Sequence, residues 1–470
     1  MDKGSRKFFR QRLEHMIEEL RSGIVTGKYA AGDFLPSESD LEGMYGLSNQ
    51  SVRKGLDVLV QERLIEKIPR IGNKVTEKPE KPHTVIRFGY HSTMENDAGV
   101  RGLLDRFHAL YPHIQVQTVA LPTSGYVPFV LEQLQAGLLD VVTVNEMNVR
   151  ELITQGAADL LQPCDIHPDT YPFLMPLLPP MNPPVVQPLL FSPVIICYNK
   201  DHLEECALPE PHSGWTWPEL LDYAVRLARP GVRFGFYFNM FMRNRWPIFL
   251  LQNGVVFQRD GDGRYVVDDD KLIASLEVGK QLLGMADAFP IALSASDTDA
   301  EDLFRDGQVS MIMTTYFGLN ELRQANVTYD IAPLPQFDSF RTMLVLIGVA
   351  VNRQSAHREE ALLLADYMSG YETQQHIRKN TMSIPANRRA AEWRGEESGY
   401  RPSRYGMYRE IVPSYRTVGD LQLSYLQLSR MQRDVKLYWT GLLNAHDFCR
   451  RVEQTLTEAG QGLQPMMPTK

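Results

Sequence analysis

The stretch Gly46-Leu-Ser-Asn-Gln-Ser-Val-Arg-Lys-Gly-Leu56 combines a tight turn with the first turns of an amphipathic helix. Gly46 permits the sharp turn, and Ser48 can cap the helix that begins after it. Val52 and Leu56 lie four residues apart, so both face the same buried side. The opposite side presents polar and basic residues: Asn49, Gln50, Ser51, Arg53 and Lys54. Such a surface suits DNA contact, although a capped helix with two outward cations is more often a solvated surface.

The segments on either side complete a helix-turn-helix that a hairpin follows. Residues 6–26 place apolar side chains at helical spacing, which predicts an amphipathic helix. Leu35-Pro-Ser-Glu-Ser-Asp40 supplies Ser37 as the N-cap of a short second helix. After the opening stretch, residues 64–76 alternate as two short strands around a basic turn. This hairpin is predicted to form a wing beside the last helix.

This segment resembles the winged helix-turn-helix domain of GntR-type bacterial transcription regulators, over roughly residues 6–77. The markers stand in the family's order and spacing: Gly27, Tyr29, Gly32, Leu35-Pro-Ser-Glu38, Leu41, Gly46-Leu-Ser48, Val52-Arg53, Leu56, Leu59, Leu64-Ile65 and Gly72. The resemblance implies that the second helix of the motif enters the major groove and that the wing reaches the minor groove. It therefore favours DNA contact over an ordinary solvated surface.

The positions carried over from the family give the candidate DNA contacts. They are Ser37, Ser39, Asn49, Gln50, Ser51, Arg53, Lys54, Arg70, Gly72 and Asn73. Many family members have arginine where Ser39 and Asn49 stand. Losing two cations removes phosphate or guanine contacts, whereas Asn and Gln suit the edge of adenine. This departure favours a different operator and weaker binding.

A second unit follows a charged, proline-rich linker. Lys78-Pro-Glu-Lys-Pro-His83 has almost nothing to bury. Beyond it, strand and helix patterns alternate, which predicts a mainly parallel sheet with helices on both faces. The predicted strands are 85–90, 114–119 and 140–144, and the predicted helices are 100–110 and 126–136. The expected organisation is a DNA-binding domain over 1–77, a linker over 78–84 and an effector domain over 85–470.

The second unit resembles the sugar-type extracellular solute-binding proteins that serve bacterial ABC importers. Matching motifs in register include Phe107-His-Ala-Leu-Tyr-Pro112, Tyr198-Asn-Lys-Asp201, Trp215-Thr-Trp-Pro-Glu-Leu220, Gln252-Asn-Gly254, Ala332-Pro-Leu-Pro335 and Ile384-Pro385. The resemblance implies two lobes that close about hinge strands on a ligand. The predicted fold class is α/β: an N-terminal winged helix-turn-helix, then a two-lobed domain of the periplasmic-binding-protein type.

The same resemblance assigns candidate ligand contacts to both lobes. They are Tyr90, His91, Asn145, Glu146, Asn239, Trp246 and Tyr316. Aromatic faces would stack on sugar rings, while amide and carboxylate groups would bond to hydroxyls. Each position also fits a core or rim residue. Family members often carry an aromatic ring where Val144 stands, so stacking on the first lobe departs from the family pattern.

Composition narrows the possible classes of function. The 470 residues carry a formal net charge of −8, which argues against an indiscriminate polyanion binder. The N-terminus lacks the apolar core of a signal peptide, and no later run is long and apolar enough to span a bilayer. We therefore expect a cytoplasmic protein that makes no membrane contact. The four cysteines lack metal-ligand spacing and no catalytic or nucleotide motif appears, so no metal, cofactor or enzymatic activity is expected.

Two further segments of the second unit are a proline-rich run and an aromatic tail. The run from Pro163 to Pro193 is predicted to be an extended surface loop, because proline disfavours helices and central strands. The tail from Tyr415 to Trp439 is rich in aromatic and apolar residues. It fits either the core of the effector domain or a dimer interface.

The expected function is that of a one-component regulator. A sugar or oligosaccharide would close the two-lobed domain and change its affinity for a double-stranded DNA operator, bound as a homodimer. One alternative is a degenerate receptor domain used for dimerisation or protein contact. Another is the branch of GntR regulators that carries an aminotransferase-like domain with pyridoxal phosphate. That domain needs a Schiff-base lysine, whereas Lys200 lies inside the Tyr-Asn-Lys-Asp motif.

Overall fold

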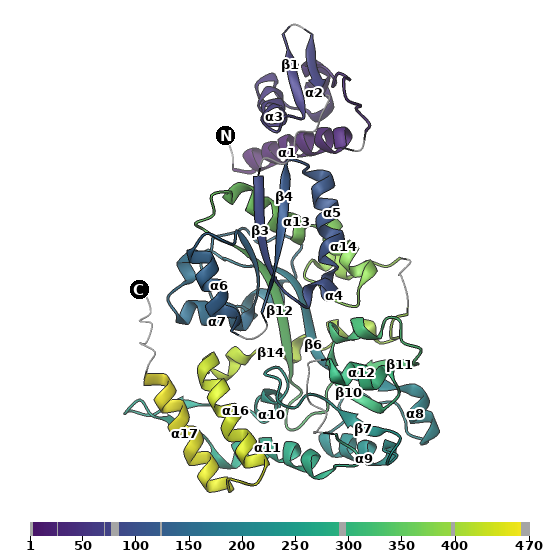
Figure 1. Ribbon diagram of the computed structural model, residues 1–470, viewed down its shortest axis with the longest axis vertical. Helices are drawn as coiled ribbons and strands as arrows, with labels where there is room; N and C mark the ends of the chain where they lie inside the picture. The colour runs from purple at the N-terminus through teal and green to yellow at the C-terminus, as the bar shows by residue number, and fades with distance from the viewer. Residues whose placement is uncertain are drawn as a thin grey trace.

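A computed structural model describes residues 3–25, 27–69, 71–76, 84–122, 125–290, 298–395 and 400–461. Figure 1 shows a small N-terminal domain at one end of an elongated molecule and two larger lobes below it. Most of the predicted linker, residues 78–83, lies outside the described residues, as does the predicted DNA contact Arg70.

The N-terminal domain is a helix-turn-helix with a two-stranded wing. Its elements are α1 (Lys3–Val25), α2 (Glu38–Tyr45), α3 (Asn49–Gln61), β1 (Ile65–Ile68) and β2 (Gly72–Val75). Gly46 ends α2 in the left-handed conformation, with φ of 60°. Gly55 allows α1 to approach α3, since a Cβ at this position would collide with Met16. The predicted helices and hairpin are confirmed.

The first lobe is built on a parallel sheet. Its strands β3 (Thr84–His91), β4 (Ile114–Leu121) and β5 (Val141–Asn145) pair in the order β4-β3-β5. The helices of this lobe are α4 (Met94–Ala98), α5 (Val100–Leu110), α6 (Tyr126–Gln135), α7 (Glu146–Thr154), α13 (Arg358–Ser369), α14 (Tyr371–Asn380) and α15 (Arg388–Ala391). The bounds of the three predicted strands and the two predicted helices agree with those of the structure to within two residues.

Two long strands connect the lobes. β6 (Gln187–Asn199) and β12 (Thr342–Val351) pair antiparallel, and the sheet continues through both lobes in the order β4-β3-β5-β12-β6-β10-β7. One end of β6 pairs with β12, and its other end pairs with β10 (Val309–Thr315). These strands therefore form the hinge.

The predicted loop over residues 163–193 is wrong at its end, because β6 begins at Gln187 and is buried throughout. Two prolines are tolerated here because neither interrupts a continuous ladder. Pro188 lies opposite Gly348, at a register shift, and Pro193 lies where β6 changes its partner from β12 to β10.

The second lobe surrounds the far ends of the hinge strands. Its other strands are β7 (Phe234–Tyr237), β8 (Gln258–Arg259), β9 (Tyr265–Val266), β11 (Tyr329–Ala332), β13 (Ile384–Pro385) and β14 (Tyr415–Arg416), of which β11, β13 and β14 pair with the hinge strands. Its helices are α8 (Lys200–Glu205), α9 (Trp217–Leu227), α10 (Pro247–Gln252), α11 (Asp269–Gly284), α12 (Asp299–Arg305), α16 (Tyr425–Trp439) and α17 (Ala445–Gln461). Short 3-10 turns are η1 (Ala158–Leu160), η2 (Pro172–Leu177), η4 (Gly318–Leu322), η5 (Tyr405–Arg409), η6 (Val412–Ser414) and η7 (Val418–Leu421).

The C-terminal helices belong to the core of this lobe. Leu428, Tyr438 and Trp439 of α16 are buried within its main hydrophobic cluster. The indole Nε1 of Trp439 donates a hydrogen bond to the Leu276 carbonyl at 2.8 Å. Of the two interpretations of the aromatic tail, the structure supports the core.

Candidate functional site

The outer face of α3 presents four polar side chains together. Asn49, Gln50, Arg53 and Lys54 are all exposed. Two acids of α2 hold two of them in place: Arg53 Nε donates to Glu38 Oε2 at 2.7 Å, and the Asn49 amide donates to the Glu42 carboxylate. The face is therefore ordered before any DNA contact.

Two serines of the predicted DNA contacts belong to α2. Ser37 is the N-cap of α2: its Oγ accepts a hydrogen bond from the Asp40 backbone N–H, and the Asp40 carboxylate accepts one from the Ser37 backbone N–H. This capping box confirms the predicted helix start. Ser39 is exposed on the first turn of the same helix. Ser39 remains a predicted DNA contact.

Two predicted DNA contacts face inward. Ser51 is buried, and its Oγ lies 2.8 Å from the Ser48 Oγ, because it shares a helix face with Gly55, which packs on α1. Asn73 is also buried, with 5% of its surface exposed, since alternation along β2 turns it toward the domain core. Both assignments are corrected. Gly72, at the start of β2, has φ of 147° and supplies the bend of the wing.

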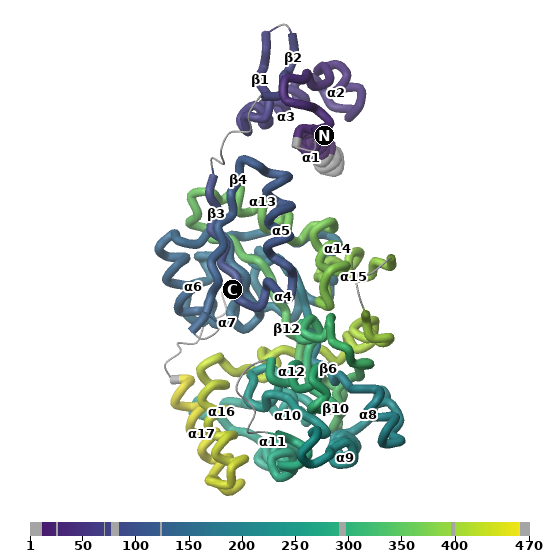
Figure 2. Tube along the Cα trace, turned by 45° about the vertical axis from the view of Figure 1, so that its right-hand side comes forward, coloured from purple at the N-terminus to yellow at the C-terminus, as the bar shows by residue number. Residues whose placement is uncertain are grey.

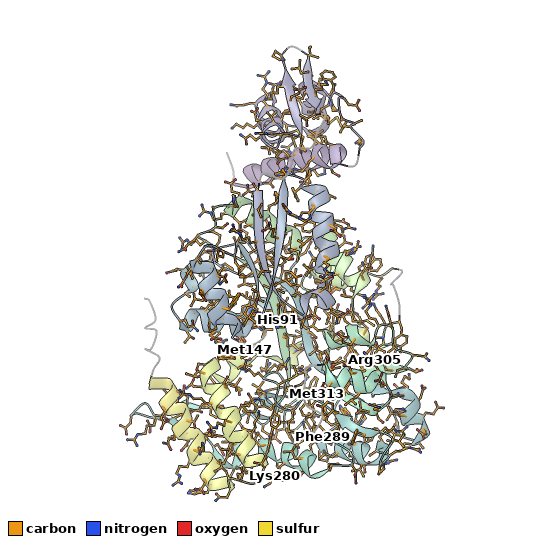
Figure 3. All side chains as sticks on the ribbon, viewed as in Figure 1. His91, Met147, Lys280, Phe289, Arg305 and Met313 are labelled. Atoms are coloured by element: carbon orange, nitrogen blue, oxygen red, sulfur yellow. The ribbon has the colours of Figure 1, made fainter. Side chains whose placement is uncertain are left out.

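A cleft lies between the two lobes. A cavity of about 660 Å³, the large chamber, adjoins one of about 440 Å³, the small chamber, and the two share seven lining residues. The shared residues are His91, Tyr126, Asn145, Asn148, Met242, Asn244 and Val345. Figure 3 shows His91 and Met147 at the lower end of the first lobe, where it meets the second. The cleft therefore lies beyond the carboxyl ends of β3 and β5, as parallel sheets of this class predict.

Four predicted ligand contacts line this cleft. His91 and Asn145 line both chambers, whereas Glu146 and Asn239 line the large one. Asn145 also caps α7, since its Oδ1 accepts a hydrogen bond from the Asn148 N–H at 2.9 Å. Glu146 is only 4% exposed and pairs with Arg150 at 2.7 Å. Burial raises the pKa of Glu146, while Arg150 acts in the opposite direction.

Three predicted aromatic contacts lie in the core, not among the lining residues of the cleft. Tyr90 packs on Phe88, with ring centroids 5.4 Å apart. Trp246 is fully buried at the start of α10. Tyr316 is fully buried too, and its hydroxyl donates to the Tyr405 carbonyl at 2.9 Å. These side chains point away from the cleft because local alternation and helix phase turn them inward.

Several residues of the cleft are not among the seven predicted ligand contacts. Phe317, the neighbour of Tyr316, lines the small chamber in its place. The guanidinium of Arg243 lies over the ring of Tyr425, 4.1 Å from its centroid, and Lys436 Nζ lies 4.4 Å from the ring centroid of Phe241. Tyr425 and Lys436 belong to α16, almost two hundred residues beyond Arg243 and Phe241 in the chain. No local signal in the tail indicated that it reaches the cleft.

A cluster of charges joins the N-terminal domain to the first lobe. α1 lies beside the upper end of α5 in both views (Figures 1 and 2). Arg21 of α1 lies over the ring of Tyr111, 5.2 Å from its centroid, and Tyr111 follows α5 directly. Arg21 also pairs at 2.5 Å with Glu18 and at 2.5 Å with Glu62, the residue that ends α3. One side chain thus contacts both the lobe and the end of the DNA-facing helix.

The charge of Arg21 is held firmly. The residue is 7% exposed, so burial acts against its charge. The carboxylates of Glu62 and Glu18 outweigh this effect and raise its pKa. The Tyr111 hydroxyl donates to the Glu18 carboxylate at 3.5 Å, which closes the cluster.

Comparisons with known proteins match the two parts of the chain separately. Residues 91–375 match the family described as bacterial extracellular solute-binding protein. The chain belongs to this family. Residues 13–75 match the bacterial regulatory proteins of the gntR family. This solute-binding family member therefore carries a regulator's DNA-binding domain at its N-terminus.

A curated relative agrees with the second match. The mannosyl-D-glycerate transport/metabolism system repressor MngR of Escherichia coli (strain K12) is 33% identical over 75 residues, which is 16% of this chain. The chain spans 30% of the length of that repressor. The similarity thus concerns the N-terminal part.

Solved structures share the fold of the two-lobed domain. An ABC substrate-binding protein from Listeria monocytogenes, in complex with cycloalternan, has a TM-score of 0.67 at 17% identity, covering 82% of this chain and 100% of its own. A solute-binding protein from Thermotoga lettingae, bound with α-D-tagatose, has a TM-score of 0.69 at 17% identity, covering 81% and 100%. The maltose/maltodextrin-binding domain of Bdellovibrio bacteriovorus, bound to maltotriose, has a TM-score of 0.65 at 16% identity, covering 80% and 99%.

The families matched are a regulator family and a solute-binding family. Lys200, the lysine weighed for a Schiff base, lies at the start of α8 and pairs with Glu210 at 2.8 Å. Across the described ranges, no helix has the length and apolar content needed to cross a membrane. Within the same residues, no three His, Cys, Asp or Glu side chains are grouped so that they could hold a metal ion.

Proposed function

We propose that this protein is a DNA-binding transcription regulator whose effector, a sugar or oligosaccharide, binds in the cleft between the lobes. The observation that carries this proposal is the combination, in one chain, of an ordered polar helix face and a hinged cleft. The contact of Arg21 with Tyr111 joins the two. Such a protein works in the compartment that holds the chromosome.

The base and phosphate contacts divide along α3. Asn49 and Gln50 lie at the start of the helix, where amides reach base edges, and Arg53 and Lys54 follow with charges suited to phosphates. Ser39 and the glycine bend of the wing supply the flanking contacts. Two copies on one operator would place two such helices in successive major grooves.

Coupling between ligand binding in the cleft and DNA binding by α3 follows from the hinge. Closure around a ligand moves the first lobe against the second, and α1 rests on the first lobe through the Arg21 cluster. A ligand that favours one arrangement shifts the position or mobility of α3, and DNA shifts ligand affinity by the same factor.

A panel of saccharides tests the cleft. A saccharide that binds should raise the melting temperature of the full chain by mass action. The same saccharide should change the affinity of the protein for a duplex selected from a random library. Stabilisation by no saccharide, or stabilisation without any change in DNA affinity, would contradict the proposal. Light scattering with and without the selected duplex tests whether two copies bind.

A further inference from the structure

The small chamber of the cleft is lined by three carboxylates. Asp97 comes from α4 of the first lobe, while Glu301 of α12 and Glu321 of η4 come from the second. Arg245 is the cation that lines the same chamber. The Asn96 amide donates to Glu321 Oε1 at 2.7 Å, which holds one carboxylate across the two lobes. The formal charge of this end of the cleft is negative.

One of these carboxylates is built into the wall with an unused oxygen. Glu301 is 4% exposed, and its Oε1 accepts a hydrogen bond from the Thr314 hydroxyl. Its Oε2 is buried and has no hydrogen-bond partner among the described residues. A Cβ at Gly318 would collide with both Glu301 and Thr314, so glycine is needed for this arrangement.

A second acceptor of the same wall is also unused. The Oδ1 of Asn244 is buried without a partner in the described part of the chain, and Asn244 lines both chambers. Leaving a buried acceptor unpaired destabilises the fold, and more so when the group is charged. Both atoms are acceptors, so a group that pairs with them must be a donor.

We propose that the small chamber binds a protonated amino group, so that the effector is an amino sugar or an oligosaccharide that contains one. This inference rests on the proposed function of the cleft. An ammonium group offers three donors and a positive charge, whereas a hydroxyl offers one donor and no charge. Three carboxylates against one guanidinium favour the cation.

Burial shifts two of these carboxyl groups toward the neutral form when no cation is near them. Burial raises the pKa of Asp97 to about 7, with Thr93 acting against it and Glu321 adding to it. Burial likewise raises the pKa of Glu301, while Thr314 and Arg245 act against it. An ammonium group in the chamber would restore the charged forms, because an opposite charge nearby favours ionisation.

Matched sugars test this inference on the full-length protein at pH 7 and fixed chloride. Each set contains a neutral sugar, its 2-amino derivative and its N-acetyl derivative, for glucose, mannose and galactose, together with chitotriose in the free-amine and N-acetylated forms. We expect at least one amine to raise the melting temperature more than its neutral and acetylated partners do. Equal or greater stabilisation by the neutral partners in every set overturns the inference but leaves the proposed function standing. No stabilisation by any sugar contradicts both.

The variant Glu301→Gln locates the effect. It keeps the size and the acceptor toward Thr314 but removes the charge, so we expect affinity for the amine to fall at least tenfold and the preference for the amine over its neutral partner to be lost. Glu204→Gln on the exposed surface of α8 removes the same charge away from the cleft and should change neither. Unchanged discrimination in Glu301→Gln overturns the inference. If this variant does not fold, the comparison of sugars on the natural chain still decides.

Discussion

In the proposed mode of DNA binding, single side chains of α3 make the contacts. Arg53 and Asn49 are exposed, but each is already bonded to a glutamate of α2. These bonds orient the two side chains and also place negative charge close to the DNA. We therefore expect the contribution of Arg53 to DNA affinity to appear in the salt dependence of binding.

Replacing Arg53 with alanine should weaken binding to DNA of every sequence. One phosphate contact is lost, so the slope of log affinity against log salt should become shallower by about 0.9. Fluorescence anisotropy over a salt series measures this slope. Arg305→Ala removes the same charge on the second lobe, far from the N-terminal domain (Figure 3), and should leave the slope unchanged. An unchanged slope in Arg53→Ala would remove this residue from the interface.

Asn49 is the side chain that we propose to contact a base edge. Asn49→Arg should raise affinity or move the preferred base from adenine toward guanine, by about 1–3 kcal/mol at one position of the site. Selection from a random duplex library, run with both proteins, measures the preference. If affinity and preference are both the same, the outer face of α3 does not dock as proposed.

The sequence predicts such residues only where one local rule applies. The capping role of Ser37 followed from a four-residue pattern, and the structure confirms it. Ser51 and Asn73 were assigned outward, but their orientation depends on which neighbour each element packs against. The same limit holds in the cleft: Tyr316 lies in the core, whereas its neighbour Phe317 lines the small chamber.

At the scale of elements, the junction of α1 and α5 is the part that joins the two functions. Arg21 satisfies Glu62 and Glu18 and also covers the ring of Tyr111. Tyr111 belongs to the motif that resembles solute-binding proteins, yet here it contacts a helix of the DNA-binding domain. Nothing local in either motif predicts this contact, because it depends on how two domains pack.

Tyr111→Leu should loosen this junction while both binding sites stay intact. The ring contact and the hydroxyl bond to Glu18 are lost, so the effect of ligand on DNA affinity should fall by at least half in free energy. Separate titrations with ligand and with DNA should each stay within about threefold of the natural protein. Tyr223→Leu on the second lobe is the matched control. Full coupling in Tyr111→Leu would mean that α1 is not the connection.

The hinge strands illustrate a second limit of prediction at this scale. The prolines near residue 190 argued for a loop, but β6 accommodates them at a register shift and at a change of partner. Both features depend on β12 and β10, which lie more than a hundred residues further along the chain. The position of α16 also depends on tertiary packing, and this helix supplies Tyr425 and Lys436 to the lining of the large chamber.

At the scale of the whole molecule, carboxyl groups of the two lobes lie close to each other across the cleft. Asp97 of the first lobe faces Glu321 of the second, and its pKa of about 7 in the folded chain exceeds the ordinary 3.8. The folded state thus binds a proton more tightly than the unfolded state. Stability contributed by this proton is present at low pH and is lost as pH rises from about 4 to 7.

Asp97→Asn should remove this dependence. The gain in stability over the natural chain should be small near pH 4, grow up to pH 7 and stay constant above it, at no more than about 4 kcal/mol. Urea unfolding at several pH values measures the difference. Asp105→Asn, on the exposed surface of α5, should give a curve parallel to the natural one. A parallel curve for Asp97→Asn would mean that this carboxyl stays ionised in the fold.

The overall architecture was predictable because it rests on two sets of ordered motifs, each with regular spacing. The alternation after residue 85 predicted the first lobe, and the stretch from Gly46 to Leu56 predicted the DNA-facing helix. The wall of the cleft was only half predictable. His91, Asn145, Glu146 and Asn239 follow from strand ends and loops, whereas the residues of α16 do not.

The central claim is that occupancy of the cleft and affinity for DNA are coupled. The most direct test is the dissociation constant of the full-length protein for its selected duplex, measured at one salt concentration without and with a saturating saccharide. The account predicts a change of at least about fivefold, and a reciprocal change of the same factor in saccharide affinity when DNA is present. Identical DNA affinity with the cleft empty and filled would contradict it.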